Sequence, residues 1–151
     1  MRRRKFIALL GGAAAWPLTA LAQQPERTRR VGVLTGLPAD DVQQQAELAA
    51  LTQQLQKLGW SDGRNIKIYY RSGASDADQT WTSAKELIEL RPDVIVAHTT
   101  SAVSALAQQT RAIPIVFVLV SDPVGNGFVE NWTKPGGNIT GLHRFRSSDG
   151  R

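Results

Sequence analysis

Four polar side chains stand together at His98, Thr99, Thr100 and Ser101, directly after an apolar run. Hydroxyls at the start of a helix suit a carboxylate or a phosphate, because the first helical turn exposes unpaired N–H groups and a partial positive charge. Thr and Ser are also ordinary helix N-caps, so capping alone explains the same residues. Anion binding and simple capping both stay open. His98 has no carboxylate near it in the sequence, which favours a hydrogen-bonded structural role.

A second polar segment, Ser121-Asp122-Pro123-Val124, follows another apolar run. Asp122 could accept an ammonium group, and Ser121 could donate to a carbonyl group. Proline biases the residue before it away from the helical region, so a simple turn also explains the Asp-Pro pair. The segment is thus either part of a binding site or only a turn.

Several kinds of catalytic site lack their required residues. The chain has no cysteine, which excludes disulfides, thiolate metal ligands and cysteine nucleophiles. Thr35-Gly36-Leu37-Pro38 follows the first apolar run where a dinucleotide fold would carry its glycine-rich turn. Neither a G-x-S-x-G elbow nor a metal-ligand spacing is present. We expect no enzymatic activity, no cofactor and no metal.

The elements that must position these side chains follow one pattern from Arg30 onward. Short β-branched runs alternate with longer segments of helical period, which is typical of a parallel sheet covered by helices. Strands are expected at residues 31–34, 66–70, 93–97, 114–119 and 139–142. Helices are expected from Asp40 or Asp41 to Gly59, from 78 to 90 and from 101 to 110. The sequence predicts an α/β fold, a three-layer parallel sheet with helices on both faces.

The predicted helices have apolar faces, and the predicted loops share one edge. The inward residues expected in the first helix are Leu48, Leu51, Leu55 and Leu58, and those in the second are Trp81, Ala84, Leu87 and Ile88. Right-handed crossovers bring every loop that follows a strand to the edge where open α/β sheets bind ligands. These loops are residues 35–40, 71–76, 98–101 and 120–124.

Residues 1–22 have the three parts of an export signal. Four basic residues at 2–5 precede an apolar run at 6–15, and Ala20-Leu21-Ala22 forms a small-x-small cleavage site. The apolar run is too short to span a bilayer, which needs roughly 20 residues. Arg3-Arg4-Lys5-Phe6-Ile7 also has the twin-arginine spacing, so this route and general secretion both stay open. We expect a periplasmic protein with a cleaved signal.

The basic charge of the chain lies mostly in that signal. Four of the 18 Lys and Arg residues and none of the 13 acidic residues lie within residues 1–22, which leaves 14 minus 13, or +1. A nucleic-acid-binding domain would carry a basic face or an arginine-rich arm. Beyond the short cluster at residues 27–30 no such feature remains, so we expect no nucleic-acid partner.

Several segments together resemble the ABC transporter substrate-binding proteins of the tryptophan- and tyrosine-binding type. The leader at 2–17 is similar to those of many exported members of this family. The matching segments in the body are Leu58-Gly59-Trp60-Ser61-Asp62-Gly63-Arg64-Asn65, residues 91–97, residues 112–117, Ser121-Asp122-Pro123-Val124 and residues 134–141. The resemblance covers residues 2 to about 142. It implies a type I periplasmic-binding fold whose two lobes enclose a small solute and deliver it to an ABC permease in the membrane.

The resemblance also implies which residues face the solute. It places the first-lobe side of the cleft at Thr35, Thr99, Thr100, Ser101, Ser121 and Asp122. For an amino-acid-like solute, the hydroxyls and the helix amides would hold the carboxylate, and Asp122 would receive the ammonium group.

The sequence departs from this family after residue 142. Members of the family have a second lobe, whereas here a polar, charged tail follows at 143–151. We therefore expect a signal at 1–22, a leader at 23–29, an N-terminal lobe at 30–142 and an atypical tail at 143–151. The predicted function is that of an exported solute-binding component, impaired by truncation. The alternative is a stand-alone exported interaction domain that forms a dimer through its half-cleft.

Overall fold

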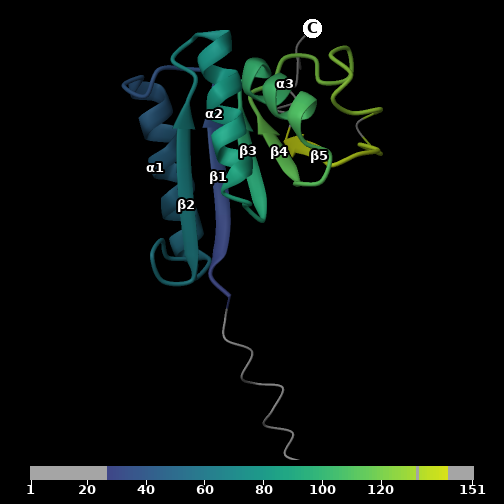
Figure 1. The fold of residues 1–151 in the computed structure, drawn as a ribbon. Coiled ribbons are helices and arrows are strands. Elements are labelled where there is room, and N and C mark those ends of the chain that lie inside the picture. The colour runs from purple at the N-terminus through teal and green to yellow at the C-terminus, as the bar shows by residue number, and fades with distance from the viewer. Residues whose placement is uncertain (1–26, 132, 143–151) are drawn as a thin grey trace, which may run out of the picture.

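The computed structural model describes residues 27–131 and 133–142, which form one five-stranded parallel sheet with three helices. The strands are β1 (Arg29–Thr35), β2 (Ile66–Ser72), β3 (Val94–His98), β4 (Ile115–Val118) and β5 (Ile139–Leu142), and their order across the sheet is β2-β1-β3-β4-β5. Every pairing is parallel, so all strand arrows end at the same edge (Figure 1). The expected signal at 1–22 and tail at 143–151 lie outside the described residues.

Helix α1 (Val42–Lys57) covers one face of the sheet. Asp41 caps it, because its carboxylate accepts a hydrogen bond from the amide of Gln44 at 2.8 Å. Leu48, Leu51 and Leu55 of the helix pack against a cluster of strand residues, Val31, Val33 and Ile66. This half of the fold is held by one helix alone.

Helices α2 (Ala77–Glu89) and α3 (Thr100–Gln109) cover the opposite face, in front of the sheet in Figure 1. Here lies the larger core, in which Leu34, Ile95, Ile115 and Phe117 are almost wholly buried. Strand residues that alternate with these point to the α1 side, as the period of two in a strand requires. The helices on both faces confirm the expected three-layer α/β architecture.

The expected elements are confirmed, with ends that differ by a few residues. The prediction of an inward position is wrong for two side chains. Trp81 in α2 is 44% exposed, and Leu58, the C-cap residue of α1, is 74% exposed. Trp81 satisfies the helical spacing, but α2 buries a narrower stripe made by Thr80, Ser83, Ala84 and Leu87. None of the helices in the described part of the chain is long and apolar enough to span a membrane.

Candidate functional site

The carboxyl ends of the strands meet in a row of loops that we call the rim: residues 36–41, 73–76, 99 and 119–124. Four backbone hydrogen bonds join neighbouring strand ends and loops: Gly73 N to Thr35 O at 2.8 Å, Ser75 N to Gly36 O at 2.7 Å, Gly36 N to His98 O at 3.3 Å and Thr99 N to Val118 O at 3.3 Å. A rim that is tied together in this way holds polar groups from separate strands in a fixed relation.

Thr99 is the most constrained residue of the rim. Its backbone has φ 89° and ψ 154°, a region that a β-branched side chain rarely adopts. Its hydroxyl accepts hydrogen bonds from the amides of Gly36 at 3.2 Å and Ala102 at 3.4 Å. Strained backbone of this kind is often found at functional sites, where the surrounding structure holds it in place.

Two further hydroxyls stand beside Thr99 at the start of α3. The oxygens of Thr99 and Ser101 lie 3.0 Å apart, and the side chain of Ser101 is exposed. Thr100 is half-buried at the first position of the helix. Thr99 thus caps α3. The exposed hydroxyl of Ser101 lies at the same end of the helix, where the partial charge is positive.

Ser121 and Asp122 form an exposed turn on the neighbouring loop. One carboxylate oxygen of Asp122 accepts a hydrogen bond from the amide of Gly125 at 2.8 Å. The Asp122 backbone has φ 44°, and Leu119 in the same loop has φ 53°, so both adopt a left-handed conformation. The turn interpretation is thus correct, and it leaves the second carboxylate oxygen of Asp122 available to a ligand.

Thr35 differs from the other candidates because it is only 1% exposed. Its hydroxyl donates to Oε1 of Gln44 at 2.7 Å and accepts from the amide of Leu37 at 3.0 Å. The structure thus places this side chain beneath the rim, where it supports the loop rather than facing the solvent.

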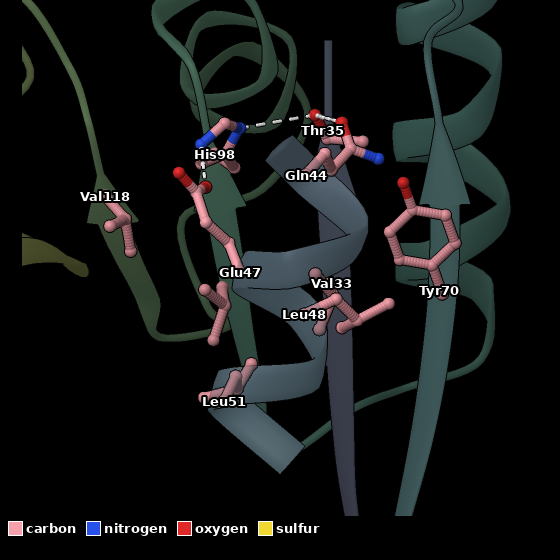
Figure 2. A pocket seen from close by; sticks show the side chains of 10 residues that line it. Val33, Thr35, Gln44, Glu47, Leu48, Leu51, Tyr70, His98 and Val118 are labelled. Carbon is pink, nitrogen blue, oxygen red and sulfur yellow. Dashed lines mark hydrogen bonds and ion pairs between the residues drawn. The ribbon is translucent and has the colours of Figure 1, made fainter. Parts of the chain in front are cut away.

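A contact that we did not predict from the sequence lies under the rim. Nε2 of His98 is 2.8 Å from a carboxylate oxygen of Glu47, which lies on α1 (Figure 2). The two atoms are close, but Nε2 has no partner in hydrogen-bond geometry, so the contact is an ion pair only when His98 is protonated. Nδ1 of the same ring lies 3.4 Å from Oγ1 of Thr35. Only the fold brings these residues together, because they come from separate elements.

A cavity of about 170 Å³ lies between α1 and the sheet, next to this pair. Its apolar wall includes Val33, Leu48, Leu51 and Val118 (Figure 2). Val96 of β3 also lines it. The hydroxyl of Tyr70 is buried at its side without a hydrogen-bond partner. Burial raises the pKa of Tyr70 above its ordinary value, and the negative charge of Asp41 raises it further.

No cluster of His, Asp and Glu side chains that could hold a metal ion occurs among the described residues. The polar groups of the rim are hydroxyls, backbone amides and four carboxylates, of which those of Asp41 and Asp76 cap helices. Such groups can bind and orient a small polar molecule.

Comparison with known proteins identifies the chain's relatives. The tyrosine-binding protein of Clostridioides difficile (strain R20291) is 36% identical over 95 residues, which are 63% of this chain and 28% of that protein. The crystal structure of a conserved domain protein from Vibrio cholerae superposes with a TM-score of 0.71 at 31% identity, over 77% of this chain and 38% of that one. The ABC domain from Streptococcus pneumoniae in complex with L-Trp gives a TM-score of 0.69 at 27% identity, over 76% and 38%.

This chain spans less than two-fifths of the length of each of these relatives. The family model described as ABC transporter substrate binding protein matches residues 31–149, which include every rim loop and all of the sheet except the first two residues of β1. The chain belongs to the ABC transporter substrate-binding protein family.

Proposed function

We propose that the rim is the first-lobe side of a binding site for an amino-acid-like solute. The observation that carries this proposal is the group of hydroxyls at Thr99, Thr100 and Ser101, which stands at the exposed N-terminus of α3. The helix dipole and the first-turn amides favour a carboxylate at this place. One relative is named for tyrosine binding and another was solved with L-Trp, which supports an α-amino acid as the ligand class.

In this proposal the two charged groups of the solute meet two different loops. The carboxylate is bound at the start of α3, and the ammonium group is bound by the second carboxylate oxygen of Asp122. The exposed hydroxyl of Ser121 adds a hydrogen bond. Thr35 supports the loop from below, because its own hydroxyl is already engaged.

The wider role follows from the family. Its members bind solutes rather than transform them, so we propose an exported protein that delivers its solute to an ABC permease. Residues 1–22 serve as its signal, and residues 30–142 form the N-terminal lobe. Because one lobe leaves a bound solute in contact with water, we expect residues 30–142 alone to bind weakly.

Amide NMR spectra of residues 23–151, titrated with L-tyrosine and L-tryptophan, test the proposal even for millimolar affinity. We expect the largest shifts at residues 99–101 and 121–122. The double variant Thr100→Ala and Ser101→Ala should abolish them, whereas Ser104→Ala, further along α3, should not. Shifts that spread over other surfaces, or that persist in the double variant, would contradict the carboxylate assignment.

A further inference from the structure

We infer that Glu47 and His98 position the rim, by tying α1 to the carboxyl ends of β1 and β3, and that this tie depends on the proton of His98. The inference rests on the proposed function only for its effect on the solute. The tie itself is a property of the protein without ligand, and it can be measured in that state.

The imidazole of His98 bridges two elements. On one side Nε2 lies 2.8 Å from the Glu47 carboxylate of α1, and on the other Nδ1 lies 3.4 Å from the Thr35 hydroxyl of β1 (Figure 2). The side chain of His98 is 14% exposed and that of Glu47 is 36% exposed. An ion pair screened this weakly by water keeps more of its attraction than a surface pair does.

The hydrogen bonds around Thr35 define what the ring can do. The hydroxyl has one proton, which it donates to Oε1 of Gln44, and it also accepts the amide proton of Leu37. In this arrangement Nδ1 of His98 donates to the same oxygen, because the hydroxyl has no second proton to give. Nε2 faces the Glu47 carboxylate, and this contact is an ion pair when Nε2 is protonated as well. The arrangement thus suits an imidazolium ring.

A neutral ring needs a different arrangement of the same atoms. If Nδ1 loses its proton, the Thr35 hydroxyl must turn to donate to it, and the amide of Gln44 must rotate to present its NH₂ group to the hydroxyl oxygen. Two residues of α1 thus respond to the proton: Glu47, which faces the ring, and Gln44, which contacts it through Thr35. The attraction between Glu47 and His98 is lost in the same step.

The tie reaches the rim through the backbone. The carbonyl of His98 accepts the amide of Gly36 at 3.3 Å, and the next residue, Thr99, accepts the same amide through its hydroxyl at 3.2 Å. A shift of the His98 ring therefore moves the strand end that holds Thr99 in its strained conformation. Thr99 is the N-cap of α3, and its hydroxyl is the first of the three at residues 99–101.

Few other charges compete for the ring. Among the residues that line the adjacent cavity, Glu47 is the one carboxylate and His98 the one group that can carry a positive charge. Tyr70 on β2, whose hydroxyl is buried, and Asp41 ahead of α1, whose charge acts on Tyr70, are further titratable groups near the cavity. The residue that β4 contributes to this cavity, Val118, is apolar.

The test uses Glu47→Gln and His98→Asn, with Glu89→Gln at the exposed end of α2 as the matched control. The amide signals of Gly36 and Thr99 are followed without solute from about pH 5 to about pH 8, the range in which histidine changes charge. In the wild type and in Glu89→Gln we expect both signals to move with pH along one titration curve. In His98→Asn this curve should disappear, and in Glu47→Gln its amplitude should fall, because the ring has lost its partner on α1.

Signals of Gly36 and Thr99 that stay constant with pH in the wild type, or a curve that survives in His98→Asn, would overturn the inference. The second measurement is the affinity for the solute. It should fall several-fold in Glu47→Gln and stay unchanged in Glu89→Gln. If the wild type binds no amino acid at all, the proposed function fails, while the ligand-free titration still decides whether the tie exists. If Glu47→Gln binds the solute as the wild type does, the tie does not position the rim.

Discussion

The amide of Gly36 donates a hydrogen bond to the hydroxyl of Thr99 across 3.2 Å, which joins the loop after β1 to the start of α3. A Cβ atom at position 36 would overlap Oγ of Ser101 and lie 2.7 Å from Oγ1 of Thr99. The loop can thus approach the helix only because residue 36 has no side chain. Two of the hydroxyls that we propose for the solute carboxylate, those of Thr99 and Ser101, lie directly against this glycine.

Gly36→Ala should therefore disturb both the fold and the rim. We expect the free energy of unfolding to fall by about 1–3 kcal/mol, the usual range for overpacking a close contact. Gly137→Ala is the matched control, because a Cβ atom there would meet nothing within 4 Å. Urea denaturation of the two variants checks the prediction. Equal stabilities of Gly36→Ala and Gly137→Ala would show that the loop moves away from α3 with no loss of stability.

The choice between Asp40 and Asp41 as the cap of α1, which the sequence left open, gives a second prediction. Asp41 accepts the amide of Gln44 at 2.8 Å, so Asp41→Ala should cost about 1 kcal/mol of stability. Asp40→Ala replaces an exposed residue outside the helix and should change stability by less than about 0.5 kcal/mol. Thermal unfolding monitored by circular dichroism separates the two. A larger loss in Asp40→Ala would mean that the helix begins elsewhere.

Thr35 tests the polar network beneath the rim. Thr35→Val keeps the shape of the side chain but removes the hydroxyl that serves Gln44, Leu37 and His98. Because these groups are then left without their partner, we expect a loss of about 1–3 kcal/mol.

Thr82→Val is the matched control for that variant. The hydroxyl of Thr82 lies on the exposed side of α2 and donates to one carbonyl of the same helix, that of Asp78. Its loss should change stability by less than about 0.5 kcal/mol. Equal effects of the two substitutions in chemical denaturation would show that the network under the rim adds nothing beyond an ordinary surface hydroxyl.

The fold was predictable because its information is local and repeated. Unbroken Val and Ile runs indicated buried parallel strands, and leucines at spacings of three and four indicated α1. Side-chain exposure was less predictable, as Trp81 shows. Its spacing suits the inner face of α2, but a helix that packs on a sheet buries only one narrow stripe.

The site was predictable only in part, for a physical reason. Strand ends and helix starts can be located from the sequence, so the rim and its hydroxyls could be named in advance. The pairing of Glu47 with His98 depends on how α1 lies across the sheet, which no local pattern encodes. The burial of Thr35 depends on the same packing, and so does the exposure that decides which hydroxyls can meet a solute.

Tyr70 carries the last prediction, because its hydroxyl is buried without a partner while its ring lines the cavity under α1. An unpaired buried hydroxyl is costly, so Tyr70→Phe should leave stability at pH 7 unchanged or raise it by about 1 kcal/mol. The pKa of Tyr70 is raised in the folded protein, so the unfolded chain releases this proton first as the pH rises. The wild type should thus lose stability above about pH 10, the ordinary tyrosine value, and Tyr70→Phe should lose less.

Denaturant unfolding at pH 7 and at several values above pH 10 measures both effects, with Tyr69→Phe on the other side of β2 as the control. Asp41→Ala should reduce the alkaline difference, because the charge of Asp41 contributes to the raised pKa of Tyr70. A clear loss of stability in Tyr70→Phe at pH 7 would instead mean that the hydroxyl is bonded in solution. In that case a water molecule in the cavity beside His98 would be the partner.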